Sequence, residues 1–146
     1  MTTRTAVLAL FAGLALAASR PSTAATPAGS PTGVWLTPED RGQVQLFDCG
    51  DRLCGRIVTS DQLRANPDLK DANNRNPALR DRPLKALTLI RDFSGGPRVW
   101  SGGSIYRPQD GGTYKGTLEM IDANTLKMTG CVVAPLCKTQ VWKRVR

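Results

Sequence analysis

Alternating apolar and polar positions over residues 102–120 give the clearest strand and turn pattern in the sequence. In residues 113–120, Tyr114, Gly116, Leu118 and Met120 share one face and polar side chains share the other, which is the two-residue period of a half-buried strand. Residues 104–106 have β propensity, and the turn residues 110–112 separate the two runs. The stretch therefore predicts a β-hairpin with one face against a core.

The alternation continues to the C-terminus. A turn at 122–124 makes apolar residues face apolar residues on the next strand, with the expected pairs Ile121–Thr125, Met120–Leu126, Glu119–Lys127 and Leu118–Met128. A last hairpin with Cys131 opposite Cys137 predicts the pairs Leu126–Trp142, Met128–Gln140 and Thr129–Thr139. Two further strands over residues 84–93 and 98–107 precede this region. The second carries Trp100, Gly102, Ser104 and Tyr106 on one face, and its paired glycines at 102 and 103 indicate a bulge.

The N-terminal half begins with a short strand at 33–37, followed by a hairpin of residues 43–49 and 54–60. Placing Cys49 opposite Cys54 predicts the pairs Leu46–Ile57 and Val44–Thr59. Residues 61–83 break the alternation and are rich in Asn, Asp, Arg and Pro. They predict a long ordered loop with a helical turn near 61–65, serving either as a functional segment or as a simple lid or linker.

These patterns predict an all-β fold of about eight antiparallel strands joined by short turns, within a single domain over residues 33–146. Such a meander either closes into an up-and-down barrel or folds into a sandwich, and closure removes the exposed edges. Aromatic residues are few, so Trp35, Trp100 and Trp142 are expected to supply a large share of the buried area.

The first 25 residues have the pattern of a secretory signal peptide, with an uncharged apolar run at 5–18 followed by small residues. Cleavage is expected after Ala17 or Ala25, and residues 26–32 form a flexible lead-in. A membrane anchor is the competing interpretation, but the run is shorter than the about 20 residues that span a bilayer. We therefore expect a soluble protein, periplasmic or secreted by a bacterium.

Four cysteines in an exported chain, Cys49, Cys54, Cys131 and Cys137, predict two disulfides with three connectivities, of which the spacing favours Cys49–Cys54 and Cys131–Cys137. Four thiolates also bind zinc, but neither pair has the two-residue gap usual in such sites and the chain has no histidine. Disulfides are therefore the prediction, and no metal is expected.

Removal of the leader, which carries Arg4 and Arg20, lowers the net charge from +8 to 18 minus 12, or +6, a moderate charge that favours contact with anionic envelope surfaces or polyanions. The basic residues are scattered and form no five-residue block, so the charge is explained by solubility, and nucleic-acid binding is not expected.

Several segments resemble the DUF2147 family of uncharacterised exported bacterial proteins. The specific matches are residues 49–57 (CGDRLCGRI) and 105–116 (IYRPQDGGTYKG); weaker ones lie at 33–35, 76–77, Arg80, 83–84, Trp100, 102–103 and 142–144. One departure is Ala86, where the family is expected to have glycine. The resemblance covers essentially the whole chain after the leader.

The resemblance implies a calycin-like or lipocalin-like β-barrel without an established activity. Its Gly-x-Trp opening is similar to that of lipocalins, in which the tryptophan closes the base of the barrel beneath a basic residue of the last strand. On that pattern Trp35 is expected to lie near Arg144, a cation–π contact of about 0.5–2 kcal/mol. The alternative is an ordinary core tryptophan with a solvated arginine.

Few residues offer catalytic chemistry. The chain has no histidine, its serines lie in no nucleophile elbow, and its cysteines are expected to be paired. Turn formation and helix capping explain the aspartates, whose spacing matches no calcium loop. We expect neither an enzyme nor a cofactor.

An eight-stranded barrel is wide enough for one small ligand, so the leading hypothesis is a binding protein for a small apolar or amphipathic molecule. Its expected lining is Trp100, Tyr106, Tyr114, Arg80, Arg82 and Asp110. The aromatic side chains serve equally well as barrel core, and a filled interior would exclude a ligand. The alternative function is an envelope protein that binds a protein partner or an anionic glycan or lipid through its basic exterior.

Overall fold

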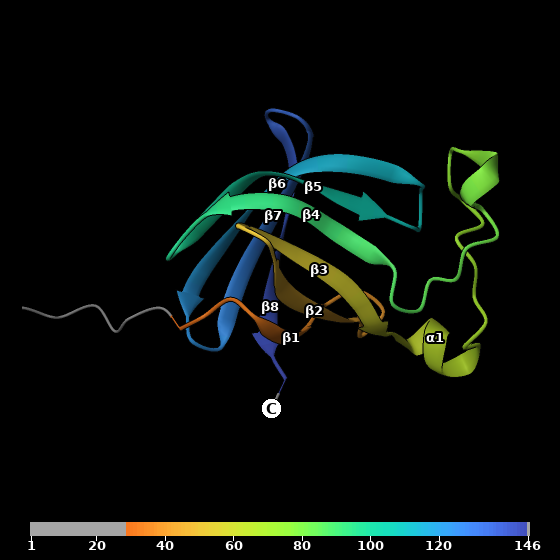
Figure 1. Cartoon of the computed structure of the whole chain (residues 1–146), viewed down its shortest axis with the longest axis horizontal. Helices are drawn as coiled ribbons and strands as arrows, with labels where there is room; N and C mark the ends of the chain where they lie inside the picture. The colour runs from red at the N-terminus through yellow and green to blue at the C-terminus, as the bar shows by residue number, and fades with distance from the viewer. Residues whose placement is uncertain (1–28, 146) are drawn as a thin grey trace, which may run out of the picture.

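The computed structural model describes residues 29–145, which form a closed barrel of eight antiparallel strands (Figure 1). The strands are β1 (Gly33–Leu36), β2 (Gln43–Cys49), β3 (Arg52–Thr59), β4 (Thr88–Gly95), β5 (Val99–Arg107), β6 (Gly112–Asp122), β7 (Thr125–Val133) and β8 (Leu136–Arg144). Each strand pairs with its neighbours in sequence, and β1 pairs with β8. The predicted all-β barrel is thus confirmed, and the sandwich alternative is excluded. The predicted leader and residues 26–28 lie outside the described residues.

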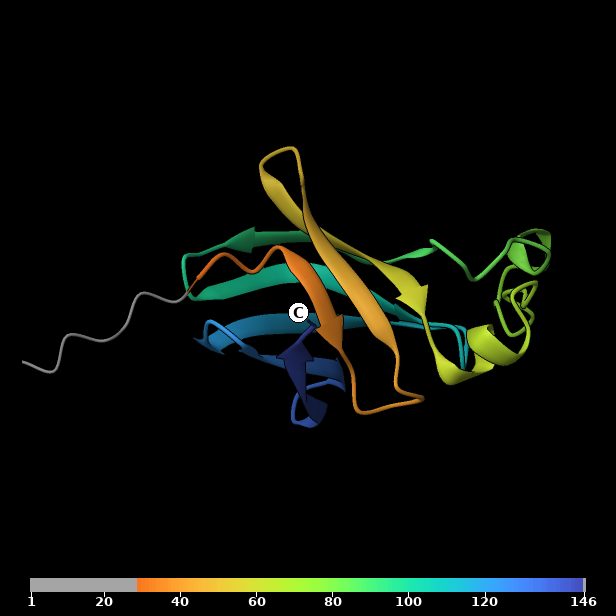
Figure 2. The same ribbon diagram turned by 90° about the horizontal axis from the view of Figure 1, so that it is seen from below.

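The strand order defines two ends of the barrel (Figures 1 and 2). We call one end the base: it carries the turns at 50–51, 96–98 and 123–124, together with residues 29–32 and the end of β8. We call the other end the mouth: it carries the β1–β2 turn at 37–42, the long loop at 60–87, the β5–β6 turn at 108–111 and the β7–β8 turn at 134–135.

The predicted registers of the C-terminal hairpins are confirmed. Leu118 pairs with Met128 and Leu126 with Trp142, so the apolar faces of β6, β7 and β8 meet inside the barrel. Cys131 lies opposite Cys137, as expected. One pair differs at the β6–β7 turn, where Asp122 rather than Ile121 pairs with Thr125.

The predicted register of the β2–β3 hairpin is wrong by two residues. Cys49 pairs with Arg52 across a two-residue turn, Leu46 pairs with Gly55, and Val44 pairs with Ile57. The Cys49–Cys54 disulfide forms all the same, with its Cα atoms 5.8 Å apart, as a diagonal link across the hairpin. A shift of two residues leaves every side chain on its predicted face, which is why the apolar pattern did not reveal it.

A bulge in β5 corrects the predicted face of Tyr106. The register with β6 shifts between Ser101 and Ser104, and Gly102 adopts φ 77°, a conformation that glycine tolerates best. The bulge itself was predicted, but its consequence was not. Trp100 points into the core, whereas the Tyr106 hydroxyl bonds to the long loop.

The long loop is ordered and begins with the predicted helical turn, α1 (Asp61–Ala65), capped by the Ser60 hydroxyl; a 3-10 turn, η1 (Pro77–Leu79), follows. The strand expected from residue 84 starts only at Thr88, because the backbone of residues 84–87 bonds within the loop and to Ile57. Ala86 adopts φ 62° there, which explains why glycine suits this position.

The core fills the base half of the barrel. It is formed by large side chains that point inward from all eight strands, chiefly Trp35, Leu46, Leu53, Phe93, Trp100, Leu118, Met120, Leu126 and Trp142. Gly103 allows this packing, since a Cβ atom there would lie 2.1 Å from the Phe93 ring. All three tryptophans are buried, as expected.

Candidate functional site

The mouth half of the barrel encloses a cavity of about 490 Å³. Its floor is formed by Ile90 and Trp142 at the top of the core, and its walls are mainly apolar. The wall side chains come from the strands and from the long loop: Val44, Ile57, Leu63, Leu69, Leu84, Leu89, Ile105, Met128, Val132 and Leu136. The interior of one barrel is therefore solid at one end and hollow at the other.

Two inward-facing glycines help to keep this half hollow. A Cβ atom at Gly130 would have only ordinary contacts, 3.6 Å to Ile105 and 3.9 Å to Tyr114, so the glycine leaves space that a side chain would occupy. A Cβ atom at Gly116 would instead lie 2.4 Å from Ile105. Gly116 therefore lets the Ile105 side chain lie close against the wall.

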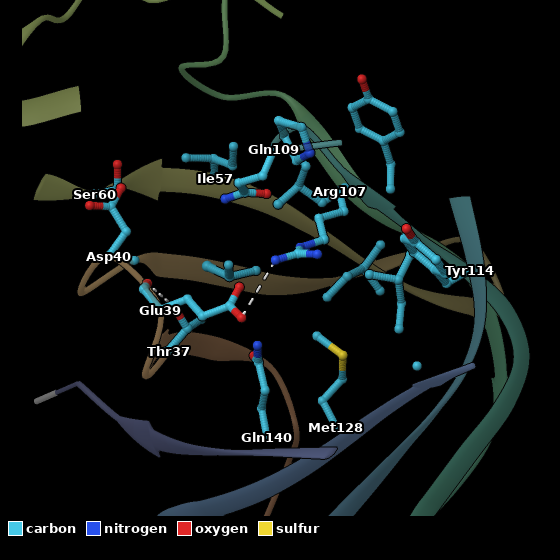
Figure 3. Close-up of a pocket in the computed structure, with 18 of the residues that line it drawn as sticks. Thr37, Glu39, Asp40, Ile57, Ser60, Arg107, Gln109, Tyr114, Met128 and Gln140 are labelled. Atoms are coloured by element: carbon cyan, nitrogen blue, oxygen red, sulfur yellow. Dashed lines mark hydrogen bonds and ion pairs between the residues drawn. The ribbon is translucent and has the colours of Figure 1, made fainter. Parts of the chain in front are cut away.

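Charged side chains meet at the opening of the cavity. Figure 3 shows Glu39 and Arg107 extending toward one another, with an ion pair of 3.8 Å between the Arg107 Nη2 and Glu39 Oε1 atoms. Lys138 donates a hydrogen bond to the same Glu39 oxygen. This bond, aided by the charges of Lys138 and Arg107 and by Gln140, lowers the pKa of Glu39 below its ordinary value of 4.5 despite partial burial. Glu39 is therefore ionised at neutral pH and shared by two cations.

Tyr114 lines the cavity and bonds to the β5–β6 turn. Its hydroxyl donates to Asp110 Oδ2 at 2.6 Å, and the Asp110 carboxylate also accepts bonds from the Gly112 amide at 2.8 Å and Arg107 at 3.1 Å. Partial burial opposes ionisation of Asp110, but the bonds from Tyr114 and Gly112 outweigh it and lower its pKa. The bond to Asp110 raises the pKa of Tyr114, so the phenol keeps its proton.

A buried carboxylate holds the long loop against β5. Asp71 is 1% exposed and accepts hydrogen bonds from the Tyr106 hydroxyl at 2.6 Å, Arg82 Nε at 2.8 Å and Asn74 Nδ2 at 2.7 Å. The Arg82 guanidinium also lies over the Tyr106 ring, 5.1 Å from its centre. Burial, followed by the bond to Asp71, raises the pKa of Tyr106. The network fixes one wall of the mouth.

Ion pairs fix the opposite side of the long loop. Arg41, in the β1–β2 turn, and Arg64, in α1, both donate to Asp61, which lowers the pKa of Asp61 to about 2. The Asp61 amide donates to the Asp40 carbonyl at 2.9 Å. These contacts connect α1 to the rim beside Glu39.

The structure separates the six residues predicted to line one site. Tyr106 and Tyr114 border the cavity, and Asp110 bonds to Tyr114 at its edge. Trp100 lies in the core, Arg82 is bound to Asp71, and Arg80 donates to the Asn74 carbonyl at 2.8 Å. The predicted set is therefore not brought together in one site.

The sequence analysis did not identify the polar residues at the rim, which are Glu39, Arg107, Lys138 and Gln140. A signal for two of them was present: the correct β7–β8 register places Lys138 and Gln140 on the same face as Trp142. Arg107 lies on the same inward face as Trp100 only because of the β5 bulge, which shifts the strand by one residue between Ser101 and Ser104.

The base is closed by the contact expected between Trp35 and Arg144. The Arg144 guanidinium carbon lies 4.3 Å from the centre of the Trp35 ring. The same side chain donates hydrogen bonds to the carbonyls of Ala123, Thr32 and Ser30 at 2.6–2.7 Å. Arg144 thus fastens residues 30–32 across the end of the barrel, and the cavity opens at the mouth.

Over residues 29–145, no group of three or more Cys, Asp or Glu side chains is placed to hold a metal ion. Within the same residues, no helix is long and apolar enough to cross a membrane. Both pairs of cysteines form disulfides, Cys49–Cys54 and Cys131–Cys137, as the spacing indicated.

The comparisons with known proteins agree with this geometry. A bacterial family described as "Uncharacterized protein conserved in bacteria (DUF2147)" matches residues 33–144, which span the barrel from β1 to β8. The chain belongs to the DUF2147 family. A search of curated proteins finds no match.

A solved structure is similar to this DUF2147 barrel: a protein from the human pathogen Helicobacter pylori that belongs to the lipocalin family. The two chains are 25% identical, with a TM-score of 0.72, and the match covers 79% of this chain and 82% of the other. The DUF2147 chain therefore has a lipocalin-like fold, as its sequence implied.

Proposed function

We propose that this protein is a non-enzymatic binding protein that holds one small, mainly apolar ligand in the mouth half of its barrel. The observation that carries the proposal is the cavity of about 490 Å³ with apolar walls. Ligand sites in proteins commonly measure about 300–1,000 Å³, with a few polar groups that orient the ligand. An eight-stranded barrel that is not filled by side chains has room for one such molecule.

The rim favours an amphipathic ligand with a polar end. Its apolar part would lie against the walls formed by residues such as Ile57 and Met128, and its polar end would meet Glu39, Arg107 and Lys138 at the opening. The Arg107–Glu39 distance of 3.8 Å is long for a charge-assisted hydrogen bond, so Arg107 retains capacity for a ligand oxygen.

We also propose that the protein is exported. The apolar run at 5–18 and the two disulfides support this, because disulfides persist in oxidising compartments such as the bacterial periplasm.

The test compares the wild type with a variant whose cavity is filled. In Gly130→Leu, the new side chain would occupy the cavity without a backbone clash, since even the nearest atom lies 3.6 Å from the added Cβ. The matched control is Ser101→Leu, at an exposed position on β5. Binding is measured by titration with a fluorescent fatty acid and by native mass spectrometry of the protein purified under mild conditions.

We expect saturable 1:1 binding to the wild type and to Ser101→Leu, and a loss of roughly ten-fold or more in Gly130→Leu, because the ligand and the leucine compete for the same space. Equal affinity of all three proteins would contradict the proposal and would place any binding outside the barrel.

A groove on the outer wall favours a second candidate function, recognition of an anionic partner. The groove measures about 460 Å³ and lies between the long loop and β4, β5 and β6. It contains Arg75, Arg82 and Arg91 beside Ser104 and Thr113. Asp71 neutralises Arg82, but among the described residues neither Arg75 nor Arg91 forms an ion pair.

This second candidate predicts salt-sensitive binding to an anionic polysaccharide such as heparin, since exposed charges are screened by salt. The double variant Arg75→Ala and Arg91→Ala should abolish the binding at low ionic strength. Arg98→Ala, in the β4–β5 turn at the base, should leave it unchanged.

A further inference from the structure

The β7–β8 hairpin ends in five consecutive apolar residues, 132–136 (VVAPL), which we call the apolar tip. All five are exposed: Val132 is 73%, Val133 61% and Leu136 66% accessible. Figure 1 shows this hairpin, in dark blue, projecting beyond the neighbouring strands. A contiguous exposed apolar surface on a soluble domain marks a contact with a partner or a membrane.

The apolar tip is held in its exposed position. The Cys131–Cys137 disulfide closes the hairpin directly below it, and Val133 pairs with Leu136 across the turn. The valines are therefore presented on a covalently closed hairpin instead of a loop free to fold back onto the barrel. Little conformational entropy should therefore be lost when the hairpin docks on a partner, because its apolar surface is already formed.

The apolar tip is continuous with the cavity. Val132 and Leu136 line the opening, while Val133 between them does not. One apolar surface therefore runs from the end of the hairpin into the barrel. A ligand that is poorly soluble in water could follow this surface without crossing the solvent.

Lysines flank the hairpin below the apolar tip. Lys138 follows Cys137 directly, and Lys115 lies opposite Cys131 on the neighbouring strand. Lys138 contacts Glu39, whereas Lys115 has no ion pair within residues 29–145. Apolar side chains at the end of a projection with cations behind them match the layering of a bilayer, with acyl chains inside and anionic head groups at the surface.

We propose that the apolar tip docks on the surface of a bilayer that contains anionic lipids, and that docking brings the mouth of the cavity to the membrane. The side chains of Val132, Val133 and Leu136 enter the interfacial region, and Lys115 contacts the head groups. Loading of a ligand from the membrane rests on the proposed binding function, but docking itself does not.

The test measures binding of the full mature chain to vesicles of phosphatidylcholine alone and of phosphatidylcholine mixed with phosphatidylglycerol, by flotation. The informative variant is Val133→Asp, since Val133 lies at the end of the hairpin but outside the cavity lining. The matched control is Val141→Asp on the outer face of β8, where the valine is 49% exposed. The two variants have the same net charge.

We expect the wild type and Val141→Asp to bind the mixed vesicles with similar affinity, and Val133→Asp to bind roughly ten-fold or more weakly, because binding scales with the apolar area buried in the interface. Binding to phosphatidylcholine alone should be weaker for all three proteins. In Val133→Trp, brominated lipids should quench fluorescence beyond that of the buried native tryptophans.

Equal vesicle binding by Val133→Asp and the wild type would overturn the proposal. So would a wild type that ignores vesicles and instead forms a dimer or binds a protein through the apolar tip. Titration of Val133→Asp with the fluorescent fatty acid separates the two proposals, since its cavity is unaltered: retained ligand binding with lost vesicle binding supports docking by the apolar tip. Vesicle binding without fatty-acid binding by the wild type would reject only the ligand hypothesis.

Discussion

The base and the mouth are built from the same eight strands, but their interiors differ. At the base, Trp35, Phe93 and Trp142 are at most 2% exposed and fill the space between the strands. At the mouth, glycine replaces large side chains at inward positions such as Gly130, and a cavity remains. Each end also has an arginine, Arg144 at the base and Arg107 at the mouth, in very different surroundings.

The difference separates stability from binding within one small barrel. Large apolar residues at the base bury enough area to hold the strands together, so the mouth can remain hollow behind a charged rim. The mouth is held by local devices instead: the Asp71 network, the Asp61 ion pairs and the Cys131–Cys137 disulfide. Changes at the base should therefore cost stability, and changes at the mouth should alter binding.

The largest effect is expected from Phe93→Ala. Phe93 is fully buried in the base core, and its removal should lower the free energy of unfolding by about 3–5 kcal/mol, since a cavity forms in a packed region. Ile105→Ala, which enlarges a cavity already present, should cost about 1 kcal/mol. Guanidinium unfolding followed by circular dichroism measures both. Equal costs would mean that the mouth is packed as tightly as the base.

Asp71→Ala should loosen the mouth while the base remains folded. The change leaves Arg82 and Tyr106 without their buried partner, at a cost of about 3 kcal/mol. Hydrogen exchange followed by mass spectrometry should show faster exchange in residues 66–87 and unchanged protection in β6 and β7. The control is Asp68→Ala, an exposed residue of the same loop, which should change stability by less than about 0.5 kcal/mol. A uniform loss of protection across the barrel would contradict the conclusion that the base stays folded independently of the mouth.

Strand registers were predicted correctly from the sequence where the apolar pattern agrees with a charge pair or a cysteine pair. The registers of β6, β7 and β8 followed from apolar faces, the Glu119–Lys127 pair and the Cys131–Cys137 link acting together. The β2–β3 register was wrong because a shift of two residues preserves both faces, and only the length of the turn distinguishes the alternatives.

The candidate site was less predictable, because it depends on contacts between distant segments. The Asp71–Tyr106 bond spans 35 positions in the sequence and follows no periodic pattern. The β5 bulge reverses the face of Tyr106 and turns Arg107 toward the cavity, and a glycine pair indicates a bulge without fixing its effect on the faces. Partial filling of the barrel follows from the sizes of side chains on all eight strands together.

The two arginines provide a matched comparison of the ends. Arg144→Met removes three hydrogen bonds to carbonyls and the contact with Trp35, so it should lower the free energy of unfolding by about 2 kcal/mol. Arg107→Met removes partly exposed ion pairs and should cost at most about 0.5 kcal/mol. Urea unfolding tests both, and a more costly change at Arg107 would reverse the assignment of stability to the base.

The smallest effect on stability is expected from Glu39→Gln, and this effect should be present at neutral pH and absent in acid. Contacts with Lys138 and Arg107 lower the pKa of Glu39, so ionised Glu39 contributes to the free energy of unfolding. This contribution is fully present above the ordinary pKa of 4.5, and it is lost as the pH falls through the lowered pKa of the folded state. The glutamate is partly exposed, so the wild type should exceed the variant by at most about 0.5 kcal/mol at neutral pH and equal it in acid.

The same variant should have a larger effect on ligand choice. Without the Glu39 charge, Arg107 and Lys138 lose a competing carboxylate, and a fatty acid should bind about three- to ten-fold more tightly at neutral pH. The corresponding fatty alcohol has no charge to exchange for that of Glu39, so its affinity should change little. Displacement titrations with the two ligands measure the ratio of the affinities of Glu39→Gln and the wild type for each ligand. An equal gain for both ligands would mean that loss of the Glu39 ion pairs opens the rim to either ligand, whereas a gain for the acid alone would assign the head-group contact to the two cations at the rim.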